Sequence, residues 1–169
     1  DACNPEALQV IRKKAESMDA ACREISDSAF EIREITDKHI AFSRINAYDD
    51  GVTWKLRGCG VYQIVNAGIA ISALEYVWSD AWQEGFGRSP AQADRMGISY
   101  RKWRDALASV KWEGRMDEVL PGVFLDGAHN PGAVEAFVKS VRMVFPKEEP
   151  PIILFSAVAD KLREFKGIN

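Results

Sequence analysis

Apolar residues that recur every three or four positions predict a helix at the start of the chain. Asn4, Pro5 and Glu6 suit the N-cap and the first turn of a helix. The residues that follow at this spacing form one apolar face: Leu8, Ile11, Ala15, Met18, Cys22 and Ile25. We expect one amphipathic helix whose apolar face packs into a core.

Short runs of alternating apolar residues come next. They cover Phe30 to Ile35, His39 to Ile45 and Val52 to Leu56, with a turn at Asp49-Asp50-Gly51. This alternation predicts two or three antiparallel strands. The following segment, Gln63 to Trp78, is apolar nearly all round, so we expect a helix that is buried on most faces.

The segment from Ser79 to Gly97 is expected to be irregular in part, because it holds four Gly or Pro residues. A helix from Ser99 to Val110, capped by Ser99, should follow. Beyond it, a domain boundary near Pro121 would divide the chain into residues 1–120 and 121–169.

The last third of the chain predicts an α/β arrangement. Val123-Phe124-Leu125 has the pattern of a short buried strand, and a helix should begin at Pro131 and run to Phe145. Ile152 to Phe155 is a second apolar run, so strand, helix and strand predict a right-handed βαβ unit with parallel strands.

The composition is that of a folded globular protein with no preference for a polyanion or a membrane. Hydrophobic residues make up 47% and charged residues 28%, and the formal net charge is −3 with both signs scattered. The absence of a basic stripe argues against a nucleic-acid partner. Polar residues interrupt the most apolar stretch, Val61 to Trp78, so no membrane span is expected.

The three cysteines, Cys3, Cys22 and Cys59, are odd in number and show no CxxC spacing, which argues against disulfides or a zinc site. We expect buried or half-buried thiols in the cytoplasm. The sequence begins at Asp1 without Met, and we expect it to be an excerpt of a longer protein.

The run from Leu125 to Pro131, LDGAHNP, is the strongest candidate for a ligand site. In α/β sheets ligands bind beyond the carboxyl ends of the strands, where Asp126 stands. The helix start at Pro131 offers a partial positive charge to an anion, and His129 lies between the two. A purely structural interpretation is equally open: Asn130 caps the helix, Asp126 ends the strand, and His129 has no role.

Three motifs together resemble the folylpolyglutamate synthase and dihydrofolate synthase family of the Mur ligase superfamily. LDGAHNP is the specific one. Trp112-Glu113-Gly114-Arg115 resembles the family's W-x-G-R, and the segment Gly60 to Ala67 resembles its G-x-H-Q-x-x-N-A. The implied fold is part of a Mur-type central ATPase domain, followed by the first βαβ unit of a Rossmann-like ligase domain.

The chain also departs from the family pattern. Tyr62 stands where the family usually has His. Asp160-Lys161-Leu162 lacks the last acid of a common Asp-Lys-Asp triplet, and the segment from Ser79 to Gly97 is longer than usual.

The resemblance implies roles for four residues. Asn66 would contact the nucleotide near its base, Arg115 would reach the ATP phosphates, and Asp126 would bind the ribose hydroxyls. His129 would act near the phosphates or the acyl intermediate as the catalytic residue. The implied reaction adds L-glutamate to folate through an acyl phosphate, with ATP and Mg²⁺, in a cytoplasmic monomer.

No Gly in the sequence is followed by Lys, so a G-x-x-x-x-G-K-[ST] phosphate loop is absent. We expect that loop and the Mg²⁺ ligands upstream of Asp1, and we expect this chain alone to be inactive. Two other classes stay open: a non-catalytic nucleotide-binding or interaction module, and a Rossmann-type oxidoreductase. The lack of G-x-G-x-x-G after a strand counts against the oxidoreductase.

Overall fold

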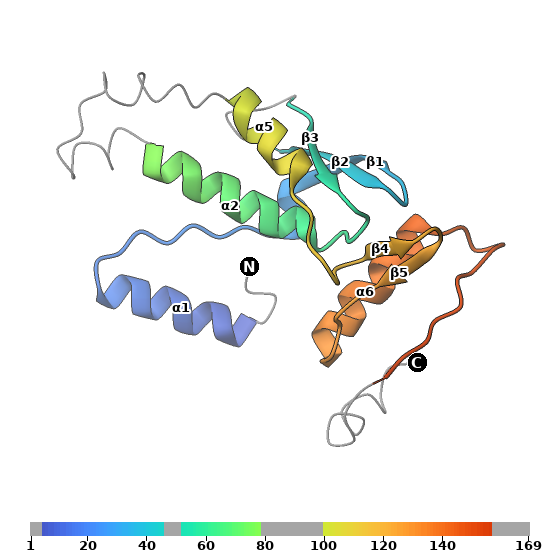
Figure 1. Cartoon of the computed structure of the whole chain (residues 1–169). Coiled ribbons are helices and arrows are strands. Elements are labelled where there is room, and N and C mark those ends of the chain that lie inside the picture. The colour runs from blue at the N-terminus through green and yellow to red at the C-terminus, as the bar shows by residue number, and fades with distance from the viewer. Residues whose placement is uncertain (1–4, 46–51, 79–99, 157–169) are drawn as a thin grey trace. The chain divides into compact units, whose positions relative to one another are not determined.

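The computed structural model describes residues 5–45, 52–78 and 100–156 (Figure 1). The chain forms two compact units that interleave along the sequence, and each is described by itself. Unit 1 comprises Asp1–Glu31, Ser43–Val52 and Ile64–Trp103, and unit 2 comprises Ile32–Phe42, Thr53–Gln63 and Arg104–Asn169. The Asp49–Gly51 turn, the Ser79–Gly97 segment, the Ser99 cap, Cys3 and Asp160–Leu162 lie outside the described residues. The boundary near Pro121 stays a prediction.

The first helix is shorter and more exposed than its apolar spacing predicts. Helix α1 spans Pro5–Ser17 and buries none of its residues. Asp19 adopts the left-handed conformation with φ 50°, and the amide of Ala20 bonds the carbonyl of Ala15 at 2.9 Å. This is a common way to end a helix, so the predicted continuation to Ile25 is wrong. Ile11 is 49% exposed, and the expected packing of this face into a core is wrong as well.

Helix α2 spans Gln63–Trp78 and packs along one side only. Ile64, Ala67 and Ile71 are buried at helical spacing, whereas Leu74 and Tyr76 are 40% and 54% exposed. The predicted helix is confirmed. The prediction that it is buried on most faces is wrong, because the described residues cover only part of its apolar surface. Within unit 1 its Gly68 admits the ring of Phe30, which lies where a Cβ would stand. Glu75 of the same helix pairs with the buried Arg44.

A three-stranded sheet supplies the core. A 3₁₀ turn (Asp27–Ala29) leads into β1 (Phe30–Ile35), and β2 (His39–Arg44) lies between β1 and β3 (Trp54–Arg57) (Figure 1). Strands β2 and β3 pair antiparallel, with Phe42 opposite Trp54, and both of these side chains are fully buried. The strands predicted for this region are thus confirmed, and their cross-strand aromatic pair is the kind that stabilises a sheet.

Between residues 117 and 144 the chain forms a hairpin followed by a helix. After α5 (Tyr100–Ser109), β4 (Asp117–Leu120) and β5 (Val123–Leu125) pair antiparallel, with Gly122 in the turn at φ 73°. Helix α6 spans Pro131–Val144, and the rings of Phe124 and Phe145 meet edge to face at 5.4 Å.

The predicted βαβ unit is only partly present in the residues described. Strand β5 and helix α6 form where predicted, but Val123 and Leu125 are 50% and 55% exposed rather than buried. The segment from Ile152 to Phe155 is not a strand, and its four side chains are exposed. An apolar run of this kind forms a strand when neighbours pair its backbone and cover both faces, and here β5 pairs with β4 instead. The fold is therefore mixed α/β with small antiparallel sheets.

None of the helices in the described ranges is long and apolar enough to cross a membrane.

Candidate functional site

The turn before α2 is shaped by glycines. Gly58 has φ 85°, and its amide bonds the carbonyl of Lys38 at 2.8 Å. A Cβ on Gly60 would lie 2.9 Å from the ring of Tyr62, so the ring folds back over this glycine. Only glycine leaves room for that approach. The backbone amide of Val61 donates to the hydroxyl of Ser140 at 3.0 Å, and Ser140 is fully buried on α6.

The W-x-G-R segment and the residue that follows it contain two left-handed positions. Gly114 has φ 68° and Met116 has φ 49°. For a residue with a long side chain this conformation costs of order 1–3 kcal/mol, and it persists only where the surroundings enforce it. The side chain of Met116 is 1% exposed, so burial of its apolar atoms offsets that cost.

Asp126 joins these two segments. Its Oδ2 accepts from the hydroxyl of Tyr62 at 2.7 Å and from the amide of Met116 at 2.9 Å. Its Oδ1 accepts from the amide of Ala128 at 2.8 Å. The amide of the next residue, Gly127, bonds the carbonyl of Gly114 at 2.8 Å. A carboxylate offers about four acceptor positions, so the three bonds leave about one for a ligand.

The loop Asp126–Asn130, hereafter the Asp126 loop, leads straight into α6. The side chain of Asn130 accepts from the amide of Ala133 at 2.9 Å, and Pro131 occupies the first turn. Asn130 is therefore the N-cap of α6, as the structural interpretation of this segment expected. Nδ1 of His129 lies 2.8 Å from the carbonyl oxygen of Gly127. A carbonyl only accepts, so Nδ1 carries the hydrogen, and in the neutral ring Nε2 is an acceptor on an exposed side chain.

Electrostatics keep Tyr62 in its neutral form. Burial raises the pKa of its hydroxyl far above the usual range, and the bond to Asp126 and the charge of Asp126 raise it further. The charge of Arg115 opposes this rise, so Arg115 also acts on Tyr62. Tyr62 is consequently a hydrogen-bond donor to Asp126 at any physiological pH.

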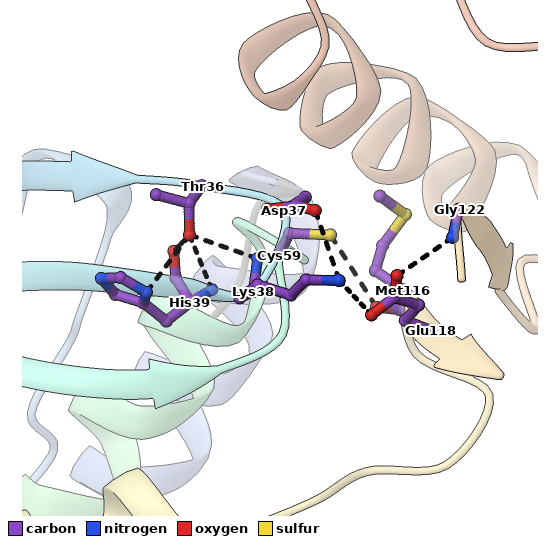
Figure 2. A network of polar contacts seen from close by, with 8 residues as sticks. All are labelled: Thr36, Asp37, Lys38, His39, Cys59, Met116, Glu118 and Gly122. Atoms are coloured by element: carbon purple, nitrogen blue, oxygen red, sulfur yellow. Dashed lines mark hydrogen bonds and ion pairs between the residues drawn. The ribbon is translucent and has the colours of Figure 1, made fainter. Parts of the chain in front are cut away.

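A second polar cluster lies in unit 2 at the β1–β2 turn (Figure 2). The Thr36 hydroxyl accepts from the amides of Lys38 and His39, which closes the turn. The ammonium of Lys38 pairs with Glu118 of β4, and Glu118 accepts from the amide of Gly122 at 3.1 Å. These contacts hold the turn against the β4–β5 hairpin.

Cys59 lies beside this cluster, with its sulfur 3.8 Å from the carbonyl oxygen of Met116 (Figure 2). Burial, followed by the nearby charges of Asp37 and Glu118, raises the pKa of its thiol to about 11. A thiol that stays protonated at neutral pH is a poor nucleophile. The expectation of buried or half-buried cysteines is right for Cys59 and wrong for Cys22, which is exposed.

Three of the four residues that the resemblance singled out lie in unit 2. Arg115 directly precedes Met116, which bonds Asp126, and His129 stands in the Asp126 loop; both side chains are exposed. Asn66 stands in the first turn of α2 and belongs to unit 1. Tyr62 was noted in the sequence only as a departure from the family. In the ranges described, no group of three His, Cys, Asp or Glu side chains is arranged to hold a metal ion.

Comparison with known proteins finds one distant relative of this chain at a significant level of similarity. The relative is the dihydrofolate synthase/folylpolyglutamate synthase of Bacillus subtilis (strain 168), 29% identical over 163 residues. The match covers 93% of this chain and 34% of the relative, so the chain spans about a third of that enzyme's length. No protein-family model and no solved structure matches the chain. The chain is a distant homologue of this enzyme, as its motifs predict.

Proposed function

We propose that this chain forms the nucleotide side of an ATP-dependent ligase that adds L-glutamate to folate. The observation that carries the proposal is the meeting of two motifs of that family. The amide of Met116 donates to Asp126, and the amide of Gly127 donates to the carbonyl of Gly114. These two bonds join the W-x-G-R segment and the LDGAHNP segment into one structure. A shared structure explains why both motifs occur together in a distant homologue of the Bacillus subtilis enzyme.

The side chains of this structure suit the phosphates and ribose of ATP. Arg115 is exposed and adjacent to Met116, where its planar fork can pair with phosphate oxygens. The remaining acceptor position of Asp126 accepts one ribose hydroxyl rather than two, because three positions serve the protein itself. For Asn66, in the first turn of α2 and in unit 1, a contact with the base is proposed on the resemblance alone.

His129 is assigned to the reacting groups. With Nδ1 held by the carbonyl of Gly127, its exposed Nε2 can take a proton from the ammonium of the incoming glutamate. In the protonated form the same nitrogen can pair with a phosphate oxygen instead. In the proposed reaction a folate carboxylate attacks the γ-phosphate of ATP and releases ADP, and the glutamate amine then displaces phosphate from the acyl phosphate to form the amide.

Mg²⁺ would neutralise charge on the phosphates during this transfer. Among the described residues no three His, Cys, Asp or Glu side chains are grouped so as to hold a metal ion, and no role in binding Mg²⁺ is assigned to them. The protein is proposed to act as a cytoplasmic monomer on small-molecule substrates.

The test uses the full-length protein with ATP, Mg²⁺, a reduced folate and L-glutamate. Phosphate release is followed together with the mass of the folate product, and each substrate is left out in turn as a control. Phosphate release that requires both folate and glutamate, with a product longer by one glutamyl residue, is the expected result. ATP binding without any such turnover would favour the non-catalytic nucleotide-binding module instead.

A further inference from the structure

Tyr62 forms a contact that links distant parts of unit 2. Its hydroxyl reaches Oδ2 of Asp126, 64 residues away in the sequence, at 2.7 Å. The same Oδ2 also accepts a hydrogen bond from the amide of Met116, and Oδ1 accepts one from the amide of Ala128. The tyrosine therefore holds the carboxylate on which both the W-x-G-R segment and the Asp126 loop depend.

The position of the Tyr62 ring is itself fixed. The ring lies against Gly60, where a Cβ would stand 2.9 Å from its Cζ and 3.1 Å from its hydroxyl. The backbone of Val61 is tied to Ser140 of α6 at 3.0 Å. The packing against Gly60 and the anchored neighbouring backbone reduce the freedom that the Tyr62 side chain loses when it bonds Asp126, which makes the bond more favourable.

We propose that Tyr62 is a positioning residue of the nucleotide site. Its hydroxyl orients Asp126, and Asp126 then fixes Met116 beside Arg115 and Ala128 beside His129 before a nucleotide arrives. The inference rests on the function proposed above, because it assigns a role in that same site. It also gives the departure at position 62 a purpose, since a hydroxyl replaces the imidazole that the family pattern leads one to expect.

A hydroxyl and an imidazole differ in their response to pH. The Tyr62 hydroxyl stays protonated between about pH 6 and pH 9, so its bond to Asp126 does not change over that range. A histidine with its ordinary pKa of about 6.5 gains a second N–H and a positive charge below that pH. A Tyr62→His protein should therefore hold Asp126 better in acid than in base.

The first measurement is calorimetric ATP binding by the full-length protein at several pH values. Tyr62→Phe should weaken binding by about five- to tenfold at every pH, because the ring remains and the donor is lost. Tyr62→His should bind ATP more tightly, relative to Tyr62→Phe, below about pH 6 than above about pH 7.5, because the imidazolium adds a positive charge to the single N–H that the neutral ring keeps. Tyr76→Phe, on an exposed part of α2, is the matched control and should stay within about twofold of wild type.

The second measurement needs no ligand. Amide hydrogen exchange reports on the N–H groups of Met116 and Ala128, which donate to Asp126. Both should exchange about tenfold faster in Tyr62→Phe than in wild type, while the amide of Gln63, which bonds Gly60, should change little.

The two measurements separate the possible failures. Unchanged exchange in Tyr62→Phe overturns the inference whatever the binding data show. Faster exchange with wild-type ATP affinity, or a Tyr62→His affinity ratio that is independent of pH, also overturns it. A wild-type protein that binds no ATP refutes the proposed function, and the exchange data then still decide whether Tyr62 orients Asp126.

Discussion

Replacing Asp126 by asparagine changes almost no volume and yet should destabilise the protein. The carboxylate accepts on both oxygens, from Tyr62 and Met116 on one and from Ala128 on the other. An amide accepts on one end and donates from the other. The new side-chain amide can lie in either of two orientations. In each of them its NH₂ group points at one of the two backbone N–H groups that bond the carboxylate in the wild-type protein, and that N–H loses its acceptor.

The size of the effect follows from the lost bonds. A hydrogen bond to a charged group contributes roughly 1.5–3 kcal/mol, and a half-buried donor left without a partner costs roughly 1–3 kcal/mol. We expect Asp126→Asn to lower the free energy of unfolding by about 2–3 kcal/mol. Asp126→Ala loses all three bonds and should lower it by about 3–5 kcal/mol.

Urea unfolding followed by tryptophan fluorescence measures these changes, since Trp54 is fully buried in the same unit. Asp105→Asn on the exposed surface of α5 makes the same chemical change, and it should stay within about 0.5 kcal/mol of wild type. A double-mutant cycle that adds Tyr62→Phe should give a coupling energy of about 1–2 kcal/mol. If Asp126→Asn were as stable as the Asp105 control, Asp126 would not hold its two segments together.

Three further predictions concern other residues of unit 2 and one exposed cysteine. Ser140→Ala should cost about 1–3 kcal/mol of unfolding free energy, because a buried backbone N–H loses its acceptor, whereas Ser109→Ala on an exposed helix end should cost under about 0.5 kcal/mol in the same urea assay. In the native protein at pH 8, iodoacetamide should modify Cys22 and spare Cys59, whose pKa is raised to about 11; equal labelling in a peptide map would contradict this. Arg115→Lys should not restore ligase turnover in a protein that still folds, because a point charge does not replace a planar fork on phosphate; wild-type kcat in that variant would remove Arg115 from the phosphate site.

Local patterns in the sequence predicted the elements that depend on near neighbours. Residue spacing and capping residues over short stretches of sequence are enough to predict several elements. These are the sheet strands, the start of α2, and the α6 helix with its Asn130 cap. The end of α1 did not, because apolar spacing continues to Ile25 and the left-handed turn at Asp19 has no strong sequence signal. Ile152 to Phe155 failed for a different reason: a strand needs a neighbour, and a pattern in one segment says nothing about its partner.

The candidate site was predicted in part. The resemblance picked out Asp126, Arg115 and His129, which the fold gathers around one hairpin and one helix start. It identified Tyr62 only as a departure from the family pattern. The bond from Tyr62 to Asp126 spans 64 residues, and a contact over that distance produces no periodic pattern in the sequence. Ser140 had no signal at all, because a serine inside an amphipathic helix looks the same whether its hydroxyl is exposed or buried against another segment.

The bonds of Asp126 differ greatly in the length of chain that each one closes. The bond to Met116 closes a loop of 10 residues, whereas the bond to Tyr62 closes one of 64. A ten-residue loop closes in about 10–100 ns, and the longer loop costs roughly 1.6 kcal/mol more in chain entropy. During folding the hairpin with its bent Met116 should therefore form early, and Tyr62 should dock after the rate-limiting barrier. Substitutions at Tyr62 should then raise the unfolding rate more than they lower the folding rate.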